Sequence, residues 1–322
     1  MINATHFSEL ENVMEYLKQV PYDVTQDKLY KASTLYEGYS ATDDATFDTC
    51  YDSRVYHHYQ ATGSQTHDIK ESLARTLHDH GMQNALKRFF ETHDKLRCVG
   101  IMGGHALLRT DATYRQITLL SKRLTEQGFC MLSGGGPGAM EATHLGAWLA
   151  GRTVDDVDDA LDMLRPSPSF NDEGWLASAF SVMAKYPQLT YDSLGIPTWL
   201  YGHEPSTPFA THIAKFFENS IREDSILTLA YGGIVYTPGS AGTMQEVFQD
   251  AVQNHYVSLG LSSPMIFLGT KYWTEEMPVY PLLEDMMHTG RYKNLLLTLT
   301  DDMDTIVDEL TKFAATPGRT RL

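Results

Sequence analysis

The chain contains 322 residues, of which 42% are hydrophobic and 20% are charged, the balance of an ordinary globular protein with one large domain or two smaller ones. Its formal net charge of −16 argues against nucleic-acid binding, which needs lysine and arginine to neutralise phosphates. No segment approaches the roughly 18 consecutive apolar residues of a membrane-spanning helix, so we expect no membrane insertion.

The N-terminus and the cysteines indicate a reducing compartment. The chain starts polar and acidic, without the basic and apolar regions of a signal peptide. Its three cysteines, Cys50, Cys98 and Cys130, are widely spaced and form no CxxC pair, a pattern that suggests neither a disulfide framework nor a zinc site. We therefore expect a cytoplasmic protein with reduced cysteines.

Residues 1–95 are polar, and we expect a mainly helical N-terminal extension. Ser8 and Glu11 have capping-box spacing before an apolar helical stripe, which predicts a helix start. Residues 36–67 show little periodicity, which indicates an irregular segment that packs through its aromatic side chains. Residues 69–92 have a helical pattern with a predicted break at Gly81.

Residues 96–322 alternate short apolar runs with helical segments, which predicts an α/β fold with a doubly wound parallel sheet and helices on both faces. A pair of helices at 152–187 interrupts this rhythm and is interpreted as an insertion. Its acidic cluster at 155–159 matches no calcium loop, so we expect a solvated helix face and no metal. The apolar runs are 97–104, 129–140, 197–202, 232–239 and 263–269.

Glycines gather where three of these runs end. In parallel α/β sheets, ligands bind outside the carboxyl ends of the strands. We therefore expect the loops after the runs 97–104, 129–140 and 232–239 to form one ligand site.

The first motif, SGGGPGAMEA at 133–142, leaves two interpretations open. Its glycines and Pro137 are typical of tight packing between a strand and a helix. Free amide groups at the start of that helix would also favour an anion. The spacing differs from a dinucleotide-binding G-x-G-x-x-G motif.

The second motif, YTPGSAGTMQE at 236–246, is equally ambiguous when taken alone. Thr243 and Glu246 have capping-box spacing, so Glu246 could close the start of a helix. The same glutamate would also stand beside amide groups that could hold a phosphate. The two roles are compatible.

Taken together, GGGPGAMEA and PGSAGTMQE resemble the LONELY GUY (LOG) family, whose members were once labelled possible lysine decarboxylases and share GGGxxGxM and PGGxGTxxE loops. The resemblance runs from about Cys98 to Leu310 and points to the larger bacterial members. It implies a Rossmann-like fold and hydrolysis of the N-glycosidic bond of nucleoside 5′-monophosphates, giving free base and ribose 5-phosphate without a cofactor. It also implies a homodimer or higher homo-oligomer.

The resemblance makes Glu246 the catalytic glutamate and Arg222 a catalytic or orienting arginine, although Arg222 could instead pair with Glu218 or Glu223 on its own helix. Gly103 and Arg109 follow the first predicted strand and are expected to reach the site. The remaining expected substrate-binding residues lie in the two glycine motifs: Gly135, Gly136, Gly138, Met140, Glu141, Gly239, Ser240, Ala241, Gly242 and Thr243.

Two residues depart from the family pattern. Ser240 replaces the second glycine of PGG, and Glu223 stands where the family usually has lysine. These changes keep a rival hypothesis open, a non-catalytic carrier or sensor that binds a phosphorylated nucleotide or molybdenum cofactor. A DNA-processing protein conflicts with the acidic charge. A pyridoxal-dependent decarboxylase would need a cofactor lysine, for which Lys215 and Lys271 are the nearest candidates.

Overall fold

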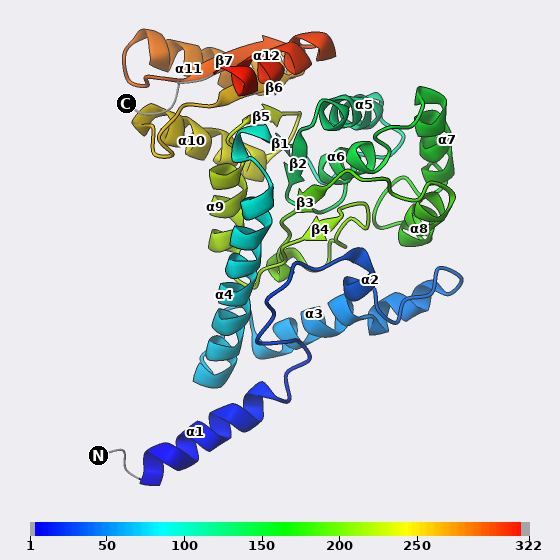
Figure 1. Cartoon of the computed structure of the whole chain (residues 1–322), viewed down its shortest axis with the longest axis vertical. Helices are drawn as coiled ribbons and strands as arrows, with labels where there is room; N and C mark the ends of the chain where they lie inside the picture. Colours follow the sequence, from blue (N-terminus) through cyan, green and yellow to red (C-terminus); the bar gives the residue numbers. More distant parts are fainter. Residues whose placement is uncertain (1–3, 317–322) are drawn as a thin grey trace.

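The computed structural model describes residues 4–316, with side chains from residue 11 onward. Seven parallel strands form one sheet in the order β4-β3-β2-β1-β5-β6-β7 (Figure 1). This confirms the predicted α/β, Rossmann-like class. The strands are β1 Cys98–Met102, β2 Cys130–Ser133, β3 Ser193–Gly195, β4 His212–Ile213, β5 Gly233–Tyr236, β6 Pro264–Leu268 and β7 Leu296–Thr300.

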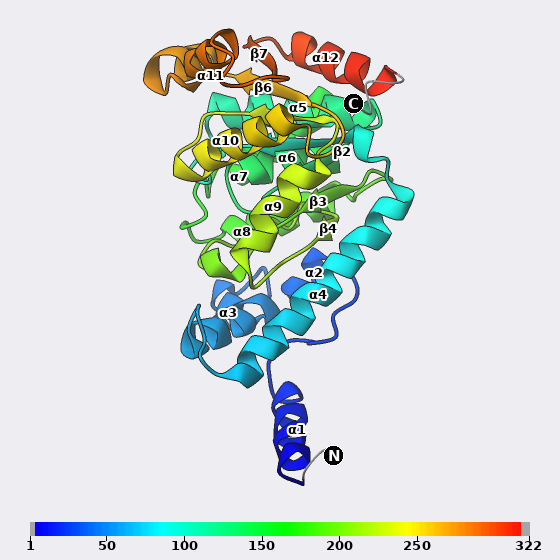
Figure 2. The ribbon, with the colours of Figure 1, turned by 90° about the vertical axis from the view of Figure 1, so that its left-hand side faces the viewer.

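Alternate strand residues belong to two hydrophobic cores, one on each face of the sheet. Helices cover both faces (Figure 2). Val99 and Ile101 pack toward one face, while Cys98 and Met102 pack toward the other. The first face carries α5 Ala112–Glu126, α6 Ala139–Trp148 and α12 Met303–Ala315, with α7 Val154–Leu164 and α8 Trp175–Lys185 beside them. The second face carries α4 Ile69–Thr92, α9 Asn219–Leu229, α10 Ala241–Tyr256 and α11 Val279–His288.

Three details of the sheet differ from the sequence prediction. The run 197–202 is not a strand, because β3 ends at Gly195 and Trp199–Tyr201 form a 3₁₀-helix, η3. Pro197 lies between them and has no amide hydrogen with which to continue a strand ladder. The short edge strands β4 and β7 were not predicted.

The N-terminal residues are more regular than predicted. The first helix, α1 Ala4–Leu17, begins before Ser8, so Ser8 is not its cap. Residues 36–67 include a 3₁₀-helix, η1 Asp44–Thr49, and a helix, α3 Tyr51–Thr62. The segment predicted as irregular is therefore largely helical. The short helix α2 Ala32–Leu35 precedes it.

Gly81 does not break α4, which continues through it from Ile69 to Thr92. A Cβ atom at Gly81 would overlap the backbone carbonyl of Gln26. The glycine therefore admits the passing chain rather than ending the helix.

The N-terminal residues pack against the β4 edge of the sheet. Tyr30 and Ile213 exchange backbone hydrogen bonds of 2.8 and 2.9 Å, which extend the ladder beyond β4. Lys215, fully buried, donates to Asp52 of α3 at 2.8 Å. Side chains from Leu17 to Phe90 thus share one hydrophobic core with the sheet, while α1 projects away from it (Figures 1 and 2).

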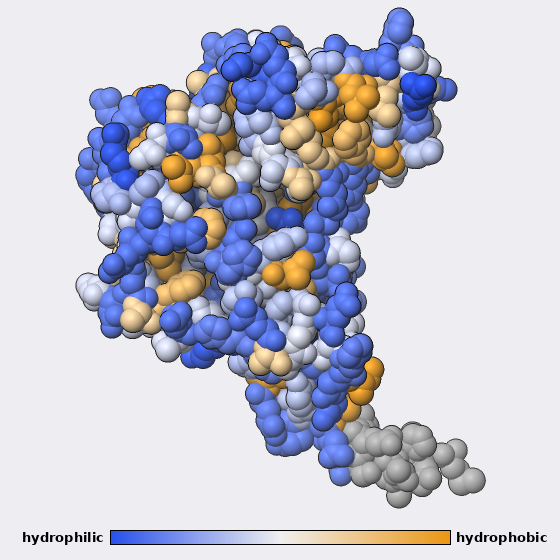
Figure 3. Space-filling view, turned by 180° about the vertical axis from the view of Figure 1, so that it is seen from behind, coloured by the Kyte–Doolittle hydropathy of each residue, from blue (hydrophilic) through white to orange (hydrophobic). Residues whose placement is uncertain are grey.

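The surface is largely hydrophilic, with hydrophobic residues gathered toward the end of the molecule where α10 and α11 lie (Figure 3). The exposed apolar side chains there are Val252 and Tyr256 of α10 and Leu282 of α11. Among residues 4–316, no helix combines the length and apolar character needed to cross a membrane.

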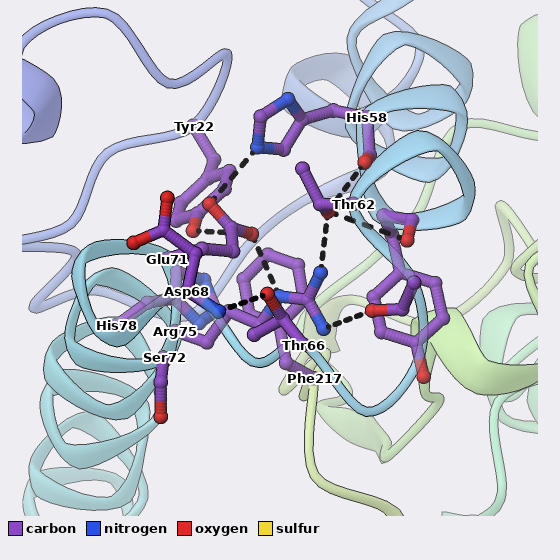
Figure 4. Close-up of polar contacts among 12 residues, drawn as sticks. Tyr22, His58, Thr62, Thr66, Asp68, Glu71, Ser72, Arg75, His78 and Phe217 are labelled. Carbon is purple, nitrogen blue, oxygen red and sulfur yellow. Dashed lines mark hydrogen bonds and ion pairs between the residues drawn. The ribbon is translucent and has the colours of Figure 1, made fainter.

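A buried carboxylate organises the N-terminal helices. Glu71 accepts from Tyr16 at 2.8 Å. It also accepts from Arg75 at 2.7 Å, and His58 Nε2 lies 3.0 Å from it (Figure 4). Burial would raise the pKa of Glu71, but these hydrogen bonds lower it below its ordinary value. The Arg75 guanidinium also lies over the Phe217 ring, 5.6 Å from its centroid.

Helix α4 also fixes the start of α9. The Asp79 carboxylate accepts from the backbone amides of Phe217 at 3.0 Å and Glu218 at 2.8 Å, immediately before α9 begins at Asn219. The N-terminal residues therefore hold the helix that carries Arg222.

Candidate functional site

A cavity of about 290 Å³ opens at the carboxyl ends of the central strands. It is lined by residues that follow β1, β2, β3 and β5, together with the first two turns of α9 and α10. The lining residues are Gly103, Gly104, His105, Met140, Tyr201, Glu204, Arg222, Glu223, Ser240, Ala241, Gly242, Thr243 and Glu246.

Helix α10 begins with Ser240 as its N-cap residue, so Thr243 lies inside the first turn and Glu246 in the second. The capping box predicted from the spacing of Thr243 and Glu246 is therefore not formed. The φ angle of Ser240 is −109°, outside the left-handed region that favours glycine. Serine can occupy this position without backbone strain.

The loop before α10 is tied to the loop after β1. Gly104 donates its amide to Pro238 O at 3.1 Å, and a Cβ atom at Gly239 would overlap the Thr243 side chain. The first intrahelical bond of α10 runs from Met244 N to Ser240 O at 3.0 Å. The amides of residues 241–243 precede it and are free to bind an anion at the cavity wall.

Arg222 crosses from α9 to the first glycine loop. Its Nε donates to Ile196 O at 3.0 Å, and a Cβ atom at Gly134 would overlap its guanidinium. Within the described residues, Arg222 forms no ion pair with Glu218 or Glu223. The alternative of a surface ion pair is thus not realised, and Arg222 lines the cavity.

Glu246 lines the cavity and keeps partial exposure to it. The pKa of its carboxyl group is raised to about 7, mainly by burial; Arg222 opposes this rise and Glu223 contributes to it. Glu246 therefore exchanges a proton near neutral pH, which is the property of a general acid or base.

A second carboxyl group, which the sequence prediction missed, lies one helical turn beyond Glu246. Asp250 is buried and accepts from Tyr236 at 2.8 Å and from Asn254 at 3.2 Å. Burial raises the pKa of Asp250 to about 7, and the Tyr236 hydrogen bond opposes that rise. This network anchors the face of α10 that carries Glu246 to β5.

Arg109 and Glu141, both predicted to bind substrate, lie outside the cavity. They form a buried ion pair with distances of 2.5 and 2.9 Å, which Tyr114 completes by donating to Glu141 at 2.8 Å. Arg109 also donates to the carbonyl groups of Ser167 and Trp175 at 3.1 Å. Through these bonds of Arg109, the pair joins the start of α6 to the insertion at 152–187. The two buried charges compensate each other away from water.

The first glycine motif approaches the cavity mainly through Met140. Gly135, Gly136 and Gly138 shape the loop behind it and do not line the cavity. Gly135 donates its amide to Ser133 Oγ at 3.1 Å, and His144 Nε2 lies 2.9 Å from the same hydroxyl group. Complete burial lowers the pKa of His144 to about 3, so a neutral imidazole supports the loop.

Sequence reasoning missed Tyr201 and Glu204, which follow β3 and form another wall of the cavity. The sequence could have indicated these residues, because the run 197–202 ends in glycine, like the runs that precede other loops of the site. Of the remaining predicted residues, Gly239 lies behind Thr243. Gly103, Met140, Arg222, Ser240, Ala241, Gly242, Thr243 and Glu246 come together around the cavity.

Across residues 4–316, no three His, Cys, Asp or Glu side chains are grouped so that they could hold a metal ion. The two lysines considered for a pyridoxal cofactor lie elsewhere. Lys215 is buried in its ion pair with Asp52, and Lys271 lies on the surface beside Glu276 at 3.3 Å.

No family model and no curated protein matches the chain. Among solved structures, it is similar to the molybdenum cofactor binding protein from the phototrophic bacterium Rippkaea orientalis, with 14% identity over 67% of this chain and 95% of that chain and a TM-score of 0.40. It is also similar to the Moco carrier protein of Chlamydomonas reinhardtii, with 16% identity over 68% of this chain and 98% of that chain and a TM-score of 0.41. A third similar structure is TM1055, a structural genomics target, with 17% identity over 67% of this chain and 98% of that chain and a TM-score of 0.44. At these identities and TM-scores, the similarities assign neither a family nor a function.

Proposed function

We propose that the chain hydrolyses the N-glycosidic bond of nucleoside 5′-monophosphates and releases free base and ribose 5-phosphate. One observation carries the proposal: Glu246 is held in the second turn of α10 and lines the same cavity as the free amides of that helix. An anion-binding group and a carboxyl group that titrates near neutral pH thus share one small space.

The 5′-phosphate would bind at the start of α10. The amides of residues 241–243 and the positive end of the helix dipole favour an anion there. The Ser240 hydroxyl group lines the same part of the cavity and can donate to a phosphate oxygen. Gly242 has no other atom within 4 Å of a side-chain position, so the space in front of it is open to a ligand.

Breaking the N-glycosidic bond places positive charge on the ribose, as in glycoside hydrolysis. Ionised Glu246 would stabilise that charge and accept a proton from the attacking water, whose oxygen bonds to C1′. The base would leave with the electron pair of the broken C1′–N bond and take up a proton from solvent. Arg222, fixed by Ile196 O, would orient the sugar or phosphate against the carboxylate. The roles need only these protein groups and water.

The carrier hypothesis remains the second candidate, because Glu223 stands where the family that the sequence resembles usually has lysine. The whole lining argues the other way. Glu204, Glu223 and Glu246 face the cavity together with one cation, Arg222. A cofactor with several negative charges would meet three carboxyl groups, whereas a cationic transition state gains from them. Neither lysine considered for decarboxylation reaches this cavity.

We further propose a homodimer that covers the apolar end of the molecule. Val252 and Tyr256 of α10 and Leu282 of α11 are exposed there. Replacing Tyr256 by glutamate should shift the sedimentation coefficient to that of a monomer. Buried, unpaired Cys50, Cys98 and Cys130 fit a reducing compartment such as the cytoplasm.

The hydrolase proposal is tested with a panel of nucleoside 5′-monophosphates, with free base and nucleotide separated by chromatography. The wild-type protein should release base from at least one nucleotide. The Glu246→Gln variant should be slower by about two to four orders of magnitude and at least as stable as the wild type at neutral pH, because it removes a carboxyl group whose pKa burial has raised. Retained nucleotide without release of base would favour the carrier.

A further inference from the structure

The order of the strands in the sheet sets the order of the loops around the cavity. Strands β3, β2, β1 and β5 are consecutive neighbours, so their loops reach the site in the same order. The anion-binding amides follow β5, whereas Tyr201 and Glu204 follow β3. Three strand spacings, about 14 Å, separate the end of β3 from the end of β5, and the Glu204 side chain reaches from the β3 side to the loops after β2 and β1. A nucleoside monophosphate with its phosphate at α10 would therefore extend its base toward Tyr201 and Glu204.

Glu204 enters the cavity wall from the β3 side, and its carboxyl group lies beside the loops that follow β1 and β2. Its Oε1 lies 3.7 Å from His105 Nδ1, and its Oε2 would lie 3.6 Å from a Cβ atom at Gly136. The side chain is 15% exposed, so it is held in the wall rather than free in solvent. An ionised carboxylate offers two acceptors and no donor.

Purine bases differ in what they offer such a group. The Watson–Crick edge of guanine places an N–H and an amino group side by side, and these two donors match both oxygens of a carboxylate. The corresponding edge of adenine pairs its amino group with a ring nitrogen acceptor, which would face a carboxylate oxygen. Hypoxanthine keeps the N–H but lacks the second donor.

We propose that Glu204 is the base-recognising residue of this site and selects guanine nucleotides, while the exposed Tyr201 ring packs against the base. The inference rests on the proposed function for the placement of the phosphate at α10. It goes beyond that function because it assigns the base and the residue that reads it.

The N-terminal helices keep this wall in place. The Trp199 indole donates to Asp52 at 2.9 Å, and a Cβ atom at Gly202 would overlap the ring of Tyr56. Tyr36 donates to the carbonyl group of Ser206. Both ends of the segment that carries Glu204 are therefore anchored, so the carboxylate is positioned before a ligand binds.

The test compares kcat/KM for GMP, IMP and AMP in the wild type and in Glu204→Gln. We expect the wild type to prefer GMP over AMP by about tenfold to a hundredfold, with IMP between them. The variant should lose a similar factor on GMP and hold or gain on AMP, because an amide offers adenine one donor and one acceptor. Glu284→Gln, an exposed carboxylate on α11, is the matched control and should keep the wild-type ratio.

Equal losses on all three nucleotides would overturn the proposal, since they would place the carboxylate on the ribose hydroxyl groups. An unchanged GMP to AMP ratio would overturn it as well. Calorimetric binding of GMP and AMP to Glu246→Gln, with and without Glu204→Gln, repeats the comparison without hydrolysis. If no nucleotide is cleaved, the proposed function fails, while the binding ratio still decides the role of Glu204.

Discussion

Replacing Glu223 by glutamine should move the pH dependence of hydrolysis to lower pH. The pKa of Glu246 is raised to about 7, mainly by burial, and the negative charge of Glu223 contributes to that rise. If ionised Glu246 is the active form, kcat/KM rises with pH until this group has lost its proton. Removing the neighbouring charge favours that loss, so the acid limb of the profile should shift downward.

The size of the shift follows from the interaction between the two carboxylates. A like charge in a partly solvated site contributes on the order of 1 kcal/mol, which corresponds to about 0.7 of a pK unit. At pH 6, the ionised fraction of Glu246 should then increase roughly fourfold. Near pH 8 the two proteins should differ little from this cause, because Glu246 is mostly ionised in both.

The assay measures base release from one nucleotide between pH 5 and 8.5 in wild type, Glu223→Gln and Asp224→Asn. Asp224 is the adjacent acidic residue on α9, but it is exposed and does not line the cavity. Its variant removes the same formal charge and should leave the profile nearly unchanged. Equal shifts in both variants, or no shift in Glu223→Gln, would refute the role assigned to Glu246.

Three further predictions concern stability and follow from buried groups. The pKa of Asp250 is raised to about 7, so wild type loses stability relative to Asp250→Asn as pH rises from about 4 to 7. Thermal unfolding of both proteins at pH 5 and pH 8 should show that the difference between their free energies of unfolding widens by a few kcal/mol, at roughly 1.4 kcal/mol per pK unit. Gly81→Ala should destabilise the protein by about 1–3 kcal/mol through overpacking against Gln26. Alanine normally stabilises a helix interior, so the sign of the change in unfolding free energy, measured by urea unfolding, decides between the two effects. Asp52→Asn leaves Lys215 buried without its ion pair and should cost about 3–5 kcal/mol. A loss below 1 kcal/mol in urea unfolding would contradict that pairing.

The sheet could be predicted because its strands carry their own signal. Buried parallel strands need continuous apolar residues, and the runs that became β1, β2, β5 and β6 each end in glycine. The strand β4 has only two residues, His212 and Ile213, too few for a pattern. Its existence depends on backbone bonds with Tyr30, which is distant in sequence.

The site was predicted in part for the same reason. Glu246 and the start of α10 lie within one local motif, so their proximity is visible in the sequence. Arg109 follows β1 closely, but its partner Glu141 belongs to the next α/β unit, and their pairing removes both from the cavity. Such pairings are set by tertiary packing, which a single sequence does not display.

The spacing of Thr243 and Glu246 shows how one pattern can mislead. It matches a capping box, yet α10 begins at Ala241 with Ser240 as its cap residue. Local spacing gives the distance between two residues along a helix, but it does not fix where the helix starts.

The most direct test of hydrolysis against ligand carriage is a single-turnover experiment, with purified protein in excess over GMP. Free guanine and ribose 5-phosphate are measured over time, because a single turnover detects even slow chemistry. We expect both products to appear in equal amounts with wild type and to be nearly absent with Glu246→Gln. GMP that stays bound and intact in the wild-type protein would contradict the hydrolase and identify the cavity as a nucleotide carrier site.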